Sequence, residues 1–305
     1  MQTYIVRRVR QSLYVIVGLS ILVFALLHLT GDPASVLLPP YANANERAEF
    51  RRQMGFDAPV YVQYLRFAGN ALRGDFGTSF LQGQPALGLI LERVPATLEL
   101  SAAAMAFGLA LALPAGIVSA LWRDGFADYL CMTIALLGQS IAVFWLGLML
   151  MTLFSVGLDL FPVSGRGGFA HLVLPAVTLG SYTAARTARL TRSELLEVLG
   201  QDFIRTARAK GLWEGIVVVK HAFRNAMVPV VTIVALEMGT LLGGAVITET
   251  IFSWPGVARL MVQSIYERDF PVVQAGVFLI GATLVALNLL VDVLYAFLDP
   301  RIRYR

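Results

Sequence analysis

The sequence ELLEVLGQDFIRTARAKGLWEGIVVVKHAFRNAMVP, from Glu194 to Pro229, is a polar and basic stretch set between long hydrophobic runs. Residues 186–224 contain eight Lys and Arg residues but only four acids. So many charges are too costly to place in hydrocarbon. The stretch must therefore lie outside a lipid bilayer, and the rest of the chain is organised around it.

Within this stretch the sequence predicts two short helices joined at a glycine. Lys210 followed by Gly211 is a helix stop, because a cation suits the last turn and glycine readily takes a positive φ. A second helical run follows from Trp213 to Asn225, and we call residues 202–225 the knob. Four residues of its first helix recur at i, i+3, i+4 and i+7 and so share one face, namely Phe203, Thr206, Ala207 and Lys210.

The composition of the chain indicates a polytopic membrane protein. Of its 305 residues, 57% are hydrophobic and 14% are charged, whereas a soluble domain has about a quarter of its residues charged. The single cysteine, Cys131, excludes an internal disulfide and a cysteine-based metal cluster, and we expect no metal site. The net charge of +4 does not indicate nucleic-acid binding, because the basic residues flank the hydrophobic runs.

Six hydrophobic runs are candidates for transmembrane helices. The first is too long for a signal peptide and lacks a clean cleavage site, so we interpret it as an uncleaved span. The fourth is short and contains Pro175 and Gly180, and its lower part is expected to continue as helix into the cytoplasm. The six predicted spans cover residues 12–29, 96–121, 129–156, 171–185, 226–247 and 272–298.

Several shorter elements are predicted between the spans. A charged helix is expected over 45–54, and a helix opened by Pro59 is expected to reach Leu72. Residues 85–93 predict a surface helix. Pro255–Gly256 predicts a turn that leads into an amphipathic helix over 257–266.

The distribution of cations predicts the orientation. The termini, the loop 122–128 and the basic stretch 186–225 together carry 15 Lys and Arg residues, against nine in the opposite set of segments. Most of the nine lie in the long first loop, which counts least. The positive-inside rule therefore places both termini and the knob in the cytoplasm.

The knob resembles the cytoplasmic loop of bacterial ABC-importer permeases. The resemblance is carried by Thr206–Gly211 (TARAKG), by residues 220–226 (KHAFRNA) and by Pro229. Arg205 and Thr206 stand where the general pattern has Glu and Ala, a variant similar to the dipeptide/oligopeptide branch. The resemblance implies that this helix docks in a groove of an ATPase subunit and transmits its motion. The implied ATPase-coupling residues are Asp202, Phe203, Arg205, Thr206, Ala207, Arg208, Lys210 and Gly211.

Segments outside the knob resemble the same branch. They include 53–55 with 63–65, the loop 73–79, and residues 250–256 (TIFSWPG) with 268–271 (RDFP), together with the C-terminal 299–303. The resemblance implies that the external segments face a solute-binding protein. The implied binding-protein-facing residues are Trp254, Pro255 and Arg259.

No catalytic motif is present in the sequence. It lacks a phosphate-binding loop, a His-Glu-x-x-His pair and a Gly-x-Ser-x-Gly elbow, so we expect a non-catalytic subunit. Energy for uphill transport must come from a partner or from an ion gradient. Polar residues inside predicted spans either line a pathway or form structural hydrogen bonds between helices. These candidates are Gln139, Glu237, Asn288 and Asp292, with Glu237 midway in its span.

The spans and the resemblance together predict an all-α polytopic membrane protein with six transmembrane helices and the architecture of a type I ABC-importer permease. Residues 1–95 would form an N-terminal span with an external region, and 96–305 a five-helix core with the coupling loop 186–225. The implied role is import of di- or oligopeptides or similar small solutes across a bacterial inner membrane. The implied partners are a second permease, two ATPase subunits that bind ATP and Mg, and an extracytoplasmic binding protein. The chain itself would carry no cofactor.

A secondary transporter or channel without an ATPase partner is the main alternative. It predicts ion-coupling acids or a filter-like loop, for which Glu237 is a loose candidate. An intramembrane enzyme is disfavoured, because the sequence pairs no nucleophile with a base. The sequence does not specify the solute.

Overall fold

A computed structural model describes residues 2–29, 43, 45, 49, 52 and 57–298, and the fold is helical with no strand among them. The chain divides into two compact units. One comprises Met1–Pro95 with Gly256–Leu290, and the other Ala96–Pro255 with Val291–Arg305. The predicted division at 95/96 shares one boundary with these units, but 256–290 groups with the N-terminal part. As a division into domains it stays a prediction.

The first unit is built from α1 (Gln2–Leu29), α4 (Val60–Leu72), the start of α5 (Ala86–Leu121), α12 (Val257–Tyr266) and most of α13 (Phe270–Leu298). α4 and α12 are helices that the sequence predicted. The hydroxyls of Ser20 and Tyr64 lie 2.9 Å apart and join α1 to α4. The predicted helix over 45–54 and the C-terminal motif from residue 299 lie outside the described residues, apart from isolated positions in the former.

Asp269 ties together two segments of this unit that the sequence predicts to be external. Its carboxylate is buried and accepts a hydrogen bond from the Ser79 hydroxyl at 2.5 Å. It also accepts one from the backbone N–H of Phe80 at 3.1 Å. Both segments carry the family resemblance, so the structure brings them into contact.

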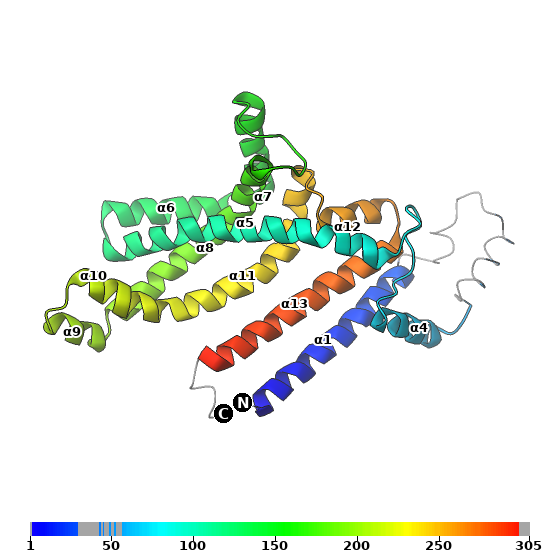
Figure 1. The fold of residues 1–305 in the computed structure, drawn as a ribbon, viewed down its shortest axis with the longest axis horizontal. Coiled ribbons are helices and arrows are strands. Elements are labelled where there is room, and N and C mark those ends of the chain that lie inside the picture. Colours follow the sequence, from blue (N-terminus) through cyan, green and yellow to red (C-terminus); the bar gives the residue numbers. More distant parts are fainter. Residues whose placement is uncertain are drawn as a thin grey trace. The chain divides into compact units, whose positions relative to one another are not determined.

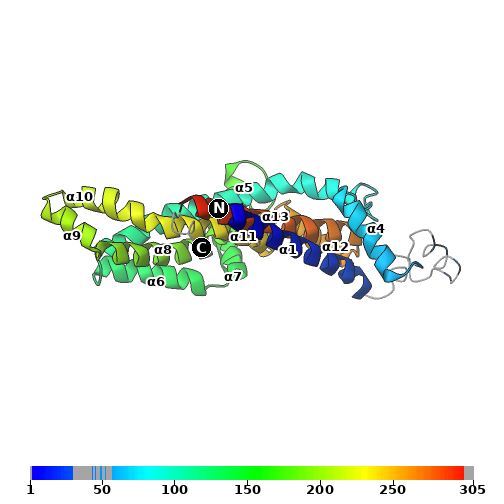
Figure 2. The same ribbon diagram turned by 90° about the horizontal axis from the view of Figure 1, so that it is seen from below.

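The second unit contains the rest of α5 and a series of helices packed around α8. These are α6 (Phe126–Ser140), α7 (Val143–Leu150), the π-helix η1 (Met151–Gly157), α8 (Phe169–Leu199), α9 (Asp202–Ala209), α10 (Glu214–Ile216), the π-helix η2 (Val217–Phe223) and α11 (Arg224–Ile251). α8 packs against α6, α7, α11 and η2 (Figure 1). The knob lies at the end of α8, where α9 and α10 run side by side (Figure 2).

Glycines allow α5 and α8 to approach closely. A side chain at Gly116 would place its Cβ 2.7 Å from the carbonyl oxygen of Ala188, and one at Gly180 would collide with the carbonyl oxygen of Ala104. Small residues at such crossings let two membrane helices meet backbone to backbone. The two helices therefore pack as one body in this unit.

Three span predictions need correction. The surface helix over 85–93 and the second span are one helix, α5, whose helical backbone continues through Pro95. The third span is not straight, because Ile141 and Ala142 adopt extended backbone and α6 meets the α7–η1 segment at 102°. The second helix of the knob, predicted over 213–225, and the fifth span are likewise continuous, because the chain is helical from Glu214 to Ile251 with Pro229 inside.

Among the described residues, four helices are long and apolar enough to cross a membrane, or five if the bent pair counts as one span. α8 is not among them, although its helix continues beyond the predicted fourth span to Leu199 as expected. Many of its residues are polar but buried against its neighbours, including Thr178, Thr183 and Thr187. The predicted number of six spans thus stays a prediction.

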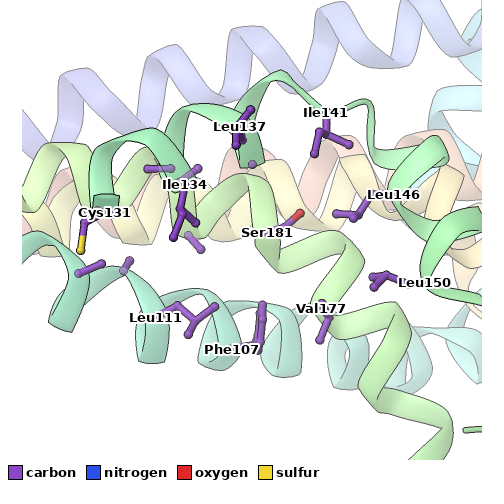
Figure 3. Close-up of a pocket in the computed structure, with 17 residues that line it drawn as sticks. Phe107, Leu111, Cys131, Ile134, Leu137, Ile141, Leu146, Leu150, Val177 and Ser181 are labelled. Atoms are coloured by element: carbon purple, nitrogen blue, oxygen red, sulfur yellow. The ribbon is translucent and has the colours of Figure 1, made fainter. Parts of the chain in front are cut away.

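An apolar cavity of about 360 Å³ lies in the second unit beside α5, α6, α7 and α8 (Figure 3). Phe107 and Leu111 contribute one wall, and Cys131 and Ile134 another. Its lining residues include no charged side chain. A charged solute would find no ionic partner there.

Candidate functional site

The knob has a core of its own. Ile204 and Ala207 of α9 are buried against Leu195 and Val198 of α8 and against Val217 of η2. Burial of several aliphatic side chains fixes α9 on the end of α8, since each such side chain stabilises by about 1.5–3 kcal/mol when fully buried. α9 is therefore a rigid extension of the helices that carry it.

The corner after α9 follows a recurring helix-ending geometry. Gly211 has φ +75° and donates its N–H to the carbonyl of Arg208 at 2.9 Å. The N–H of Leu212 reaches the carbonyl of Ala207 at 3.4 Å. Together these bonds make a Schellman motif, which satisfies carbonyls that a helix end leaves free. The predicted helix and its glycine stop are confirmed.

An ion pair spans the corner. Arg208 donates two hydrogen bonds to Glu214, from Nε at 3.1 Å and from Nη2 at 2.6 Å. This bonding raises the pKa of the Arg208 guanidinium above its ordinary value, and both side chains remain partly exposed. The pair sets the angle between α9 and α10 more than it adds stability, because exposed pairs contribute about 0–1 kcal/mol.

The buried side of α9 is formed by Ile204 and Ala207, whereas Phe203, Thr206 and Lys210 are exposed. Of the four residues predicted to share one face, only Ala207 is therefore buried, and Ile204 is the residue that fills the core. Ala207 faces its own chain, so a bulky side chain there would disturb the knob before it met any partner.

The outer surface of the knob is apolar and cationic. Trp213 at its tip is 75% exposed. Other large apolar side chains surround it in the sequence and are also exposed, namely Phe203, Leu212, Ile216 and Val219. Arg205 and Lys210 are exposed as well, and Arg205 lies 3.5 Å from Asp202. A rigid, exposed apolar patch is typical of a docking surface for another protein.

A buried carboxylate anchors α8 just before the knob. Asp128 is 3% exposed and accepts a bidentate pair from Arg192, from Nε to Oδ1 at 2.7 Å and from Nη2 to Oδ2 at 2.6 Å. It also accepts the Ser119 hydroxyl and the N–H of Asp124. The carboxylate thus joins the end of α5, the following turn, α6 and α8. No sequence signal indicated this pair, because its members are 64 residues apart.

Glu237 is the one pathway candidate that the structure buries in an ion pair. It is 3% exposed, its Oε1 lies 2.8 Å from Nη1 of Arg186, and its Oε2 accepts the Thr183 hydroxyl at 3.5 Å. Gln139 and Asp292 are half-buried, and Asn288 is exposed on α13. Gln139, Glu237 and Asp292 belong to the second unit and Asn288 to the first, and their pathway role stays a prediction.

The residues predicted to face a binding protein differ in how deeply they are buried. Trp254 is fully buried and donates its indole N–H to the carbonyl of Ala96 at 2.8 Å. It fixes the interior of the second unit and cannot face a partner in this conformation, so that prediction is wrong for Trp254. Pro255 and Arg259 are half-buried and stay predictions. Nearby, the buried Glu249 accepts a hydrogen bond from Thr97 at 2.7 Å, a contact that no sequence signal indicated.

Comparison with known families decides what kind of protein carries this knob. A family profile described as "Binding-protein-dependent transport system inner membrane component" matches residues 112–304, and the corresponding N-terminal profile matches 1–101. The chain belongs to this permease family. The permease is therefore a multi-pass inner-membrane subunit of an ABC importer. Such subunits are not catalytic, since ATP is hydrolysed by ATPase subunits that work with two permeases and a binding protein.

Curated relatives extend over the full length of the permease. It is 42% identical over 306 residues to the "Glutathione transport system permease protein GsiC" of Escherichia coli (strain K12), covering 100% of both chains. It is 43% identical over the same length to the protein of that name from Salmonella paratyphi A. The resemblance to the peptide-importer branch is confirmed by these relatives.

Solved structures support the fold. An inward-facing MetNI methionine ABC transporter matches with a TM-score of 0.59 and 20% identity, covering 69% of the permease and 96% of that chain. An amino acid ABC transporter crystallised with histidines matches with a TM-score of 0.54 and 15% identity, covering 68% and 94%. The ABC-importer permease fold predicted from the sequence is thus confirmed.

Proposed function

We propose that the permease imports a small peptide of the glutathione kind and that its knob receives the motion of an ATPase. The exposed tip around Trp213 on a packed core is the observation that carries this proposal. A docking element must be stiff where it joins the transporter and apolar where it meets its partner, and the knob has both properties. The names of the full-length relatives support the choice of solute.

The remaining parts of the importer follow from this assignment. Two ATPase subunits bind ATP and Mg, while the permease binds neither. A second, homologous permease completes the pathway, and a binding protein delivers solute to external segments that include Pro255 and Arg259. The excess of cations in the knob and at the termini supports a cytoplasmic position for all of them. Closure of the ATPase pair then moves the knob, and alternating access follows.

Reconstitution tests the proposal directly. The permease pair, the ATPases and the binding protein would be placed in liposomes with labelled glutathione outside. We expect uptake that requires both internal ATP and the binding protein. Uptake that continues without ATP and follows an imposed ion gradient would instead make the protein a secondary transporter. Uptake of other solutes with exclusion of glutathione would overturn the solute assignment alone.

The corner at Gly211 should be sensitive to backbone strain and not to bulk. A Cβ at this position would meet nothing within 4 Å, but φ +75° is costly for most residues, by roughly 1–2 kcal/mol. We expect Gly211→Val to reduce ATP-driven uptake several-fold while the complex still assembles. Gly211→Asn should retain most uptake, because asparagine tolerates this conformation. Equal uptake by the two variants would show that the geometry of the corner is unimportant for coupling.

A further inference from the structure

Arg186 lies deeper in the molecule than its sequence position suggests. The sequence places it at the start of the cytoplasmic stretch, but the structure places its Nη1 2.8 Å from Oε1 of Glu237, near the middle of α11. Glu237 is eleven residues into the predicted span 226–247, which corresponds to about 16 Å of helix. A hydrocarbon core is about 30 Å thick, so the predicted span would place the pair near the membrane midplane.

The two partners differ in exposure. The side chain of Glu237 is 3% exposed and that of Arg186 is 49% exposed. A guanidinium facing hydrocarbon at this depth would be unfavourable by roughly 2.5–3.5 kcal/mol or more. We therefore infer that the exposed side of Arg186 faces water or protein.

Neighbouring residues extend this face along α8. Tyr182, Arg186 and Arg189 occur at i, i+4 and i+7, and all three are exposed. Arg189 has no ion-pair partner among the described residues. This face therefore carries two cations, and Glu237 is the buried acid that pairs with one of them. It therefore has a positive balance of charge.

We propose that Arg186, oriented by Glu237, binds a carboxylate of the solute during translocation. A guanidinium presents a planar fork of N–H donors that suits a carboxylate, and the contact with Glu237 is made at Nη1, 2.8 Å from Oε1. Glu237 also competes with the solute, which keeps the interaction weak enough for release, as a transport site requires. This inference rests on the proposed function and assigns the chemical class of the cargo as a small anionic peptide.

The test compares a carboxylate with its neutral counterpart. Glutathione and its diamide, in which both carboxylates are replaced by neutral amides, would be offered to the reconstituted importer, with Arg186→Gln, Arg186→Lys and the wild type in parallel. Arg166→Gln is the matched control, because Arg166 also pairs with an acid, Glu99 at 2.6 Å, but lies in the predicted external loop. We expect Arg186→Gln to raise KM for glutathione about tenfold and to leave the amide nearly unchanged. Arg186→Lys should be intermediate, and Arg166→Gln should behave as wild type.

Glu237→Gln should change KM for glutathione in the opposite direction to Arg186→Gln. Without its acidic competitor, Arg186 should hold glutathione more tightly, so KM should fall and kcat should fall with it. If the pair is only structural, Arg186→Gln should reduce the uptake of glutathione and of its amide equally, or Glu237→Gln should raise KM. Either result would overturn the inference. If Arg186→Gln does not assemble, the KM values of Arg186→Lys and Glu237→Gln decide whether Arg186 binds the solute. Failure of the wild type to take up glutathione would count against the proposed function instead.

Discussion

Trp213→Glu should reduce ATP-driven uptake by about tenfold or more, because it places a charge in the centre of the apolar tip of the knob. Trp213 is 75% exposed in the permease alone, and Leu212 beside it is also exposed. Buried tryptophans in protein interfaces commonly contribute 2 kcal/mol or more, which corresponds to at least a tenfold loss of binding. The loss should appear in co-purification of the ATPase and in uptake, while the permease itself stays folded.

Trp122→Glu is the control for this prediction. Trp122 is 59% exposed and lies in the turn between α5 and α6, a segment also predicted to be cytoplasmic but outside the knob. It should co-purify with the ATPase and transport as wild type does. If both tryptophan variants lose the ATPase equally, docking extends beyond the knob, and if neither does, the apolar tip is not the contact.

Asp128→Ala should lower the free energy of unfolding by about 3–5 kcal/mol, since it leaves the largely buried Arg192 without its carboxylate. Arg192 is 27% exposed at its side chain, and the Ser119 hydroxyl and the N–H of Asp124 lose their acceptor as well. Thermal unfolding of the purified permease in detergent would measure the change. Uptake should also fall, because the carboxylate holds α8 to the α5–α6 turn.

An exposed ion pair in the same turn provides the matched control. Arg123 lies 3.3 Å from Asp124, and both side chains are more than 60% exposed. Arg123→Ala should therefore change stability by about 0–1 kcal/mol. In addition, Asp128→Ala with Arg192→Ala should be less destabilised than the sum of the single variants. Additive losses would mean that the two side chains act independently.

Features set by neighbouring residues could be predicted from the sequence. α12 begins directly after Pro255–Gly256, although the turn itself lies at residues 252–253, and α9 ends shortly before Gly211. Helix starts and stops depend on local chemistry. The permease fold was predicted from the family resemblance. The break at Ile141–Ala142 was missed because neither residue is a helix breaker, although the hydroxyl of Ser140 bonds back to the carbonyl of Leu136, a contact that bends helices.

Features set by distant residues could not be predicted. Glu237 was found from its position in an apolar run, but its partner Arg186 is remote in sequence and was assigned to the cytoplasmic stretch. Trp254 was expected at a surface because of its motif, yet tertiary packing buries it against Ala96. The burial of Ile204 could not be predicted, because the core that it fills is supplied by α8 and η2.

The two helices that hold the knob also hold the Arg186–Glu237 pair, and this has a mechanical consequence. From Leu199 back to Arg186 is about 20 Å of helix, and from Glu214 to Glu237 about 35 Å, helical throughout. The knob and the ion pair thus connect the same two helices at two levels, and the helical segments between these levels differ in length. Motion of the knob would slide one helix along the other, and the Arg186–Glu237 ion pair is the contact that such sliding would stretch.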